Sequence, residues 1–192
     1  MILASKSPRR KEILENIGFN LKIRSEEVEE VSEEIEVIEK IKDIAFKKVG
    51  AVAEKFPNDY VVGADTIVEL DGKIIGKPQD EKEAFEILKS LSGRAHNVIT
   101  AYSFINKSKG IMIKDYSITK VYFKNLDKKM IDWYIASKEP MDKAGAYGIQ
   151  GKGAIFVEKI EGDFFTVMGF PVEKFMDNLI KIGVSLDEIE TI

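Results

Sequence analysis

The chain has 192 residues, which is enough for one domain or for two small lobes around a substantial core. Hydrophobic residues make up 44% and charged residues 32% of the sequence, the profile of an ordered soluble protein. A formal net charge of −4 argues against a general nucleic-acid binder, whose surface would be basic. A local basic cluster that holds one phosphorylated small molecule stays compatible with this charge.

Several kinds of site and location are excluded by composition. No apolar run approaches the roughly 18 to 20 residues of a membrane span, so no membrane partner is expected. No signal peptide is expected either, because Met1–Ala4 has no basic region ahead of it. The chain has no cysteine, which excludes disulfides and thiolate metal sites and suits a reducing cytoplasm. His96 is the single histidine, so catalysis would depend on carboxylates, lysines and arginines, with or without a metal ion.

The N-terminal segment predicts a strand, a turn and a helix. Met1–Ala4 is expected as a short buried strand and Lys11–Ile17 as helix, with Ser7 as N-cap and Pro8 at the first helical position. The run SKSPRR (Ser5–Arg10) therefore places two hydroxyls and two guanidinium groups at a helix N-terminus, where free amides favour an anion. We favour a phosphate-binding turn over the alternative, a capped helix with solvated arginines.

A second strand is expected over Asn20–Arg24, followed by an acidic run over Glu26–Glu36. Most of these acids are expected to form a solvated face. Ser32 is predicted as the N-cap of a helix that ends near Phe56. Its buried stripe is expected to hold Ile35, Ile38, Ile41, Ala45, Val49, Val52 and Phe56.

An unusual carboxylate stands in the stretch YVVGADTIVELDGKIIGKP. Asp65 lies between two β-branched runs that predict strand, and a carboxylate there is costly to bury without a partner. By itself it is somewhat better explained by a bend in which its oxygens accept local backbone amides. Asp71-Gly72 predicts a hairpin turn, after which Lys77 lies on a loop from which it could approach Asp65.

The remaining elements follow from caps and periodicity. Asp80 and Asp127 are expected to cap helices that run to Leu91 and Ser137. His96, expected as a hydrogen-bonded structural residue, begins a long hairpin. Strands are expected over 96–105, 111–123, 154–160 and 164–168, and a glycine-rich loop over 139–153. A helix is expected over 172–182 and a helical turn within 185–192. The core positions expected on the helices are Met130, Ile131, Trp133, Tyr134, Phe175, Met176, Leu179 and Ile180. No repeat or linker divides the chain, which predicts a single domain over residues 1–192.

Five motifs in order resemble the Maf family of nucleoside triphosphate pyrophosphatases, also called septum-formation inhibitors. They are SKSPRR, GADTIV, GKP, LSGRAH and DKAGAYGIQGKGA, and together they span nearly the whole chain. The resemblance implies an α/β fold with an elongated mixed β-sheet flanked by helices and two lobes with a deep central groove. It also implies a cytoplasmic homodimer that hydrolyses a nucleoside triphosphate to the monophosphate and pyrophosphate with a divalent metal cation, Mg or Mn.

The resemblance also implies roles for single residues. Asp65 matches the catalytic base, and Glu30 with Asp65 would hold the metal ion. The substrate-binding residues have three implied roles. Arg9, Thr66 and Gln150 match positions that select the base, and Ser5, Ser7 and Arg10 match the turn that faces the phosphates. Lys48 and Lys77 match positions that neutralise the charge of the triphosphate. The chain departs from the family pattern with Val49 in place of Ala and Phe170 in place of Leu, which we interpret as packing differences.

The form DKAGAYGIQG is similar to the branch that acts on dTTP and UTP. A Gln150 amide can match the O4 and N3–H edge of uracil or thymine, although Gln can also read other bases. Two alternatives stay open. One is a pyrophosphatase for modified purine nucleotides such as 7-methyl-GTP, and the other is a non-catalytic nucleotide-binding regulator of cell division.

Overall fold

The structure is a computed structural model that describes all residues from Met1 to Ile192. Its strands are β1 (Ile2–Leu3), β2 (Lys22–Ile23), β3 (Val61–Leu70), β4 (Lys73–Ile75), β5 (Ala95–Asn106), β6 (Ile111–Phe123) and β7 (Val157–Glu161). Its α-helices are α1 (Pro8–Asn16), α2 (Val37–Lys55), α3 (Glu81–Leu91), α4 (Lys128–Ile135), α5 (Phe164–Met168) and α6 (Val172–Lys181). Short 3-10 turns are η1 (Glu139–Asp142), η2 (Ala144–Ala146), η3 (Gly151–Phe156) and η4 (Leu186–Glu188).

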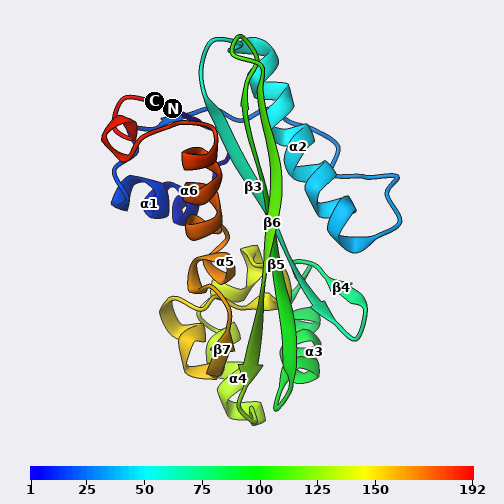
Figure 1. Ribbon diagram of the computed structural model, residues 1–192. Helices are drawn as coiled ribbons and strands as arrows, with labels where there is room; N and C mark the ends of the chain where they lie inside the picture. Colours follow the sequence, from blue (N-terminus) through cyan, green and yellow to red (C-terminus); the bar gives the residue numbers. More distant parts are fainter. The chain divides into compact units, whose positions relative to one another are not determined.

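All seven strands belong to one mixed sheet flanked by helices (Figure 1). The order is β2-β1-β3-β5-β6-β7, and β4 pairs with β3 outside this path. β1 runs parallel to β2 and β3, whereas β4 is antiparallel to β3 and β7 is antiparallel to β6. The predicted α/β class with a mixed sheet is confirmed. None of the helices combines the length and the apolar character that crossing a bilayer requires.

The chain forms two compact units. Strands β3, β5 and β6 are each divided between them, with one part of the strand in the first unit and the other part in the second. The first unit comprises Met1–Asp65, Thr100–Ser117 and Gly169–Ile192, and the second comprises Thr66–Ile99 and Ile118–Met168. The single domain over residues 1–192 and the groove between two lobes stay predictions.

In the first unit, helices cover both faces of the sheet (Figure 1). Helix α2 buries Val49 and Val52 against Val61 of β3, as its apolar spacing predicts. On the other face, Phe175 of α6 meets the rings of Tyr102 and Phe104 on β5 at centroid distances of 5.5 and 5.6 Å. The two chain ends meet here, where the Met1 ammonium group donates to the Ile192 carbonyl at 2.5 Å (Figure 1).

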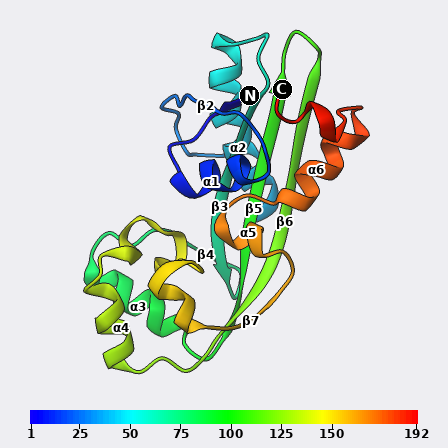
Figure 2. The same ribbon diagram turned by 90° about the vertical axis from the view of Figure 1, so that its left-hand side faces the viewer.

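In the second unit, α3 and α4 pack side by side (Figure 2). Leu88 of α3 and Ile131 of α4 share one core with Val68 of β3 and Phe123 of β6. The predicted caps are present, since the Asp80 carboxylate accepts from Glu83 N–H at 2.7 Å and Asp127 caps α4 in the same way. Asp71 and Gly72 both have positive φ, as the predicted tight hairpin turn requires.

Three predicted elements differ from the structure, and one is the strand over 154–160, which begins only at Val157 after the 3-10 turn η3. Helix α2 begins at Val37 rather than beside Ser32, and Ile35 is 91% exposed instead of buried. The Ser32 hydroxyl accepts from the Glu34 amide and so forms a local turn that competes with helix. Residues 164–168 form helix α5 rather than a returning strand, because the Asp163 carboxylate accepts the amides of the first helical turn.

Three further expectations were also corrected. Trp133 and Ile180 are 48% and 53% exposed, so each lies on the outer side of its helix rather than in the core. Asp65 does not stand in a bend, because β3 runs through it without interruption. The bend therefore cannot explain this carboxylate.

Candidate active site

The first unit gathers seven of the ten predicted site residues, beginning with Asp65 on β3. Side chains alternate along a strand, so Val61, Gly63 and Asp65 share the face that α2 covers. A Cβ atom at Gly63 would stand 2.8 Å from Val49 Cγ2 of α2, so only glycine lets the helix come this close. This close approach places Lys48, the neighbour of Val49, beside Asp65.

Lys48 is the centre of this cluster. Its ammonium Nζ donates to Asp65 Oδ1 at 2.6 Å, and it also contacts Glu30 Oε1 at 2.9 Å. The Lys48 and Asp65 side chains are only 19% and 16% exposed, so their charges are largely shielded from water. Asp65 Oδ2 accepts no hydrogen bond from the protein.

The irregular acidic segment before α2 brings Glu30 into place. Glu26 pairs with Lys55 of α2 at 2.5 Å, and Lys47 donates to the Val31 carbonyl at 2.8 Å. Hydrogen bonds from Lys47 and Ser32 also lower the pKa of Asp43 on the same helix. Lysines of α2 therefore hold the segment along the helix, while most of its acids are exposed, as predicted.

The turn before α1 has the predicted form. Ser7 caps the helix by accepting from Arg10 N–H at 3.5 Å, and Ser5 Oγ accepts from Ser7 N–H at 3.1 Å. The Arg10 guanidinium is fixed at both ends, since Nη1 donates to Ser5 Oγ at 3.3 Å and Nε to the Gly169 carbonyl at 2.9 Å. The turn thus orients two hydroxyls and one guanidinium group together.

The charges of this cluster act on one another. Burial lowers the pKa of Arg10, the negative charges of Asp65 and Glu30 oppose this lowering, and the charge of Arg9 adds to it. An arginine keeps its proton despite such a shift. With Lys48, the cluster holds three cationic and two anionic side chains, which suits a polyanionic ligand.

The two carboxylates also fit a divalent cation. Glu30 and Asp65 both turn an oxygen toward one positive charge, the Lys48 ammonium group. No group of three or more His, Asp or Glu side chains is placed to hold a metal ion. Two carboxylates are what a Mg²⁺ site needs when substrate phosphates supply further ligands.

The other predicted site residues belong to the second unit. Lys77 is exposed and pairs with no carboxylate, whereas Thr66 and Gln150 are half-buried. Gly145 of the glycine-rich loop donates from its amide to the Gly76 carbonyl at 3.0 Å. A Cβ atom at Gly145 would stand 2.7 Å from Val68 Cγ2, so this loop packs closely on β3 and beside the loop of Lys77.

Two residues of the second unit were missed as candidates. Glu139 accepts backbone amides of the glycine-rich loop, and Tyr134 accepts the amide of Gly148 at 3.2 Å. Tyr134 was predicted only as a core residue. The signal that could have marked Glu139 is its place immediately before Pro140, at the start of a glycine-rich segment whose amides need acceptors.

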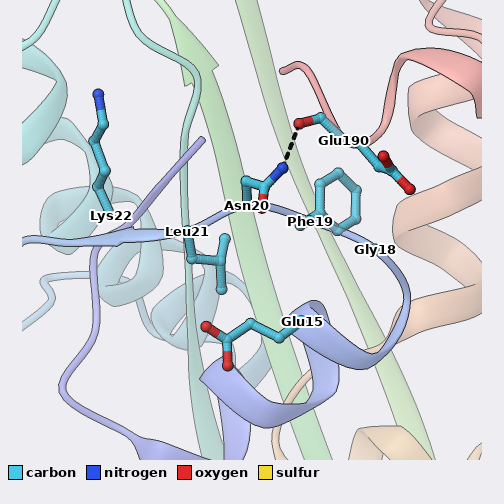
Figure 3. A pocket seen from close by; sticks show the side chains of 7 residues that line it. All are labelled: Glu15, Gly18, Phe19, Asn20, Leu21, Lys22 and Glu190. Atoms are coloured by element: carbon cyan, nitrogen blue, oxygen red, sulfur yellow. Dashed lines mark hydrogen bonds between the residues drawn. The ribbon is translucent and has the colours of Figure 1, made fainter.

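An open pocket of about 620 Å³ lies elsewhere in the first unit (Figure 3). It is lined by Glu15, Gly18, Phe19, Asn20, Leu21, Lys22 and Glu190, and the Asn20 amide donates to the Glu190 carbonyl at 2.7 Å across it. None of these residues belongs to the predicted site.

The chain matches the model of a family described as Maf-like protein over residues 1–182. It belongs to the Maf family. A relative from Fusobacterium nucleatum named dTTP/UTP pyrophosphatase is 53% identical over the full length of both chains. Relatives of the same name from Alkaliphilus oremlandii and Pyrococcus abyssi are 49% and 48% identical, and they cover 91% and 95% of this Maf chain and 91% and 96% of their own lengths.

The Staphylococcus aureus Ham1 protein structure is a more distant match. It shares 15% identity with this Maf chain, covers 64% of this chain and 70% of its own, and has a TM-score of 0.48.

Proposed function

We propose that this Maf protein hydrolyses dTTP and UTP to the monophosphate and pyrophosphate. The observation that carries the proposal is the shielded carboxylate of Asp65 within a cationic cluster beside a helix N-terminus. A full-length relative named for this activity, 53% identical, supports it further.

Asp65 is proposed as the general base. Its Oδ1 is held by Lys48, so Oδ2 is left to accept a hydrogen bond from a water molecule. The water oxygen forms a bond to the α-phosphorus while the bond from that phosphorus to the α,β-bridging oxygen breaks. Pyrophosphate leaves with the electron pair of that bond, and the proton of the water passes to the Asp65 carboxylate.

The surrounding side chains are proposed to bind the triphosphate. Ser5, Ser7 and Arg10 would donate to phosphate oxygens, and Lys48 would neutralise charge that develops as pyrophosphate leaves. Glu30 and Asp65 are the residues that would hold a divalent cation, Mg²⁺ or Mn²⁺. When bound, such a cation supplies charge neutralisation at the phosphates and a more acidic water.

Two further residue roles are proposed on the strength of the family resemblance. Arg9, Thr66 and Gln150 would select the base, and Lys77, which pairs with no carboxylate, would contact phosphate. A homodimer in the cytoplasm is likewise proposed from the resemblance. Light scattering on the eluting protein would test the oligomeric state.

The direct test is a panel of nucleotides incubated with the purified protein and Mg²⁺ or Mn²⁺, with pyrophosphate release as the readout. The proposal expects the highest kcat/KM for dTTP and UTP. A preference for 7-methyl-GTP would support the modified-purine alternative. Binding of nucleotides without any pyrophosphate release would support the non-catalytic regulator.

A further inference from the structure

The backbone around Gln150 is fixed on both sides by two side chains, Tyr134 of α4 and Glu139 at the start of the glycine-rich loop. Before Gln150, the Gly148 N–H donates to Tyr134 Oη at 3.2 Å. After it, the Lys152 N–H donates to Glu139 Oε2 at 3.1 Å and the Gly153 N–H approaches Oε1 at 3.4 Å. The backbone on either side of Gln150 is therefore held by α4 and η1.

Tyr134 and Glu139 act as one pair. The Tyr134 hydroxyl donates to Glu139 Oε1 at 3.1 Å. Burial raises the pKa of Tyr134, and the negative charge of Glu139 raises it further, so the hydroxyl keeps its proton. Its oxygen is then free to accept from Gly148. The ring is fully buried and packs edge-on against Phe156 at 4.9 Å, which fixes the position of the hydroxyl.

The glycines of the loop show how closely it lies against this pair. A Cβ atom at Gly151, where φ is +68°, would stand 3.1 Å from Glu139 Oε2. A Cβ atom at Gly153 would stand 2.9 Å from Tyr134 Oη and would also clash with the Gly148 carbonyl. Only glycine permits both approaches, so the loop is closed around Gln150 and held tightly.

We propose that Glu139 and Tyr134 are positioning residues that set the discrimination of uracil from cytosine through Gln150. The inference rests on the proposed function and on the base-selecting role of Gln150. Uracil offers an acceptor at O4 and a donor at N3, whereas cytosine offers a donor at N4 and an acceptor at N3. A Gln side chain that starts from a fixed backbone position can meet one of these patterns at good distance and angle, whereas a loop that moves lets the amide adapt to both.

The test compares UTP with CTP in three variants. Glu139→Gln keeps the shape of the side chain but presents an NH₂ group to a backbone N–H, and Tyr134→Phe removes the hydroxyl and keeps the ring. Glu158→Gln is the matched control, since Glu158 is exposed on β7 and its side chain makes no hydrogen bond or ion pair.

We expect the ratio of kcat/KM for UTP to that for CTP to fall about 10-fold in the first two variants, which is roughly the discrimination carried by one misplaced hydrogen bond. The loss should appear mainly as a higher KM for UTP. The control should keep the wild-type ratio. Thermal melting of each variant shows whether it is folded under the assay conditions.

Each other outcome has a definite meaning. Equal losses with UTP and CTP in folded variants would assign a purely structural role and overturn this inference while leaving the proposed function in place. Failure of both variants to fold would overturn it in the same way. A wild-type protein that releases no pyrophosphate from any nucleotide would overturn the proposed function and this inference together.

Discussion

Replacement of Asp65 by asparagine is the sharpest test of the proposed chemistry. The substitution keeps the size of the side chain but removes its charge and its ability to accept a proton. A positioned base contributes roughly 100-fold or more to rate, so kcat with dTTP or UTP should fall by at least about 100-fold, or about 2.7 kcal/mol of transition-state stabilisation.

The fold should survive this change. Asp65 loses its ion pair with Lys48, but the ammonium group keeps Glu30 at 2.9 Å and the amide oxygen can still accept from it. We expect destabilisation of about 1 kcal/mol, since one hydrogen bond to a charged group is weakened rather than removed. For a chain of this size, that lowers the melting temperature by roughly 2 to 4 °C.

Pyrophosphate release and thermal melting measure the two effects separately. Asp115→Asn is the matched control, because Asp115 is also a strand carboxylate of the first unit and pairs with Lys174 at 3.4 Å outside the cluster. It should keep nearly full activity. Retention of more than about a tenth of wild-type activity by Asp65→Asn would refute the assignment of Asp65 as the base.

Four other outcomes are expected. Lys48→Met should lower kcat and raise KM for dTTP and UTP in the pyrophosphate assay, because the proposed triphosphate site loses the ammonium group beside Asp65. Lys77→Met should raise KM with an unchanged melting temperature, because this exposed lysine pairs with no carboxylate; a lower melting temperature would count against that reading. Gly63→Ala should destabilise the fold by about 1 to 3 kcal/mol, since its Cβ atom would overlap Val49, and a neutral result in thermal melting would contradict this packing. Burial lowers the pKa of His96 to about 4, so the unfolded chain binds a proton first as pH falls from 6.5 toward 4. Between these pH values, protonation of His96 in the unfolded chain lowers the free energy of unfolding by up to about 1.4 kcal/mol for each pH unit. The melting temperature of His96→Gln should therefore fall less steeply with pH in this range than that of the wild type.

Local signals in the sequence were sufficient for much of the fold. Ser7, Asp80 and Asp127 cap the helices that they were predicted to cap, because an N-cap is satisfied within three residues of itself. The Asp71-Gly72 turn was predictable for the same reason. The boundary at residues 32–37 was not, because the Ser32 hydroxyl serves a local turn as well as it would serve a helix.

Exposure was less predictable than secondary structure. Apolar spacing placed Trp133 and Ile180 in the core beside Tyr134 and Leu179. Tyr134 and Leu179 are buried as predicted, but Trp133 and Ile180 are about half exposed. Phe164–Met168 has strand-like composition, yet it forms α5, because Asp163 supplies the acceptors for its first turn. The exposure of Trp133 and Ile180 depends on tertiary contacts, whereas the Asp163 cap is a local signal that the strand-like composition outweighed in the prediction.

The sequence by itself determined the α/β class, most helix starts and the capped turn at Ser5–Arg10, since each depends on neighbouring residues. It could place Asp65 in a strand but left open whether the carboxylate was structural. Only the tertiary structure brought Lys48 and Glu30 to it, through the close approach of α2 that Gly63 permits. A shielded charge needs a partner from elsewhere in the chain, and the spacing of residues along the sequence does not specify which one will arrive.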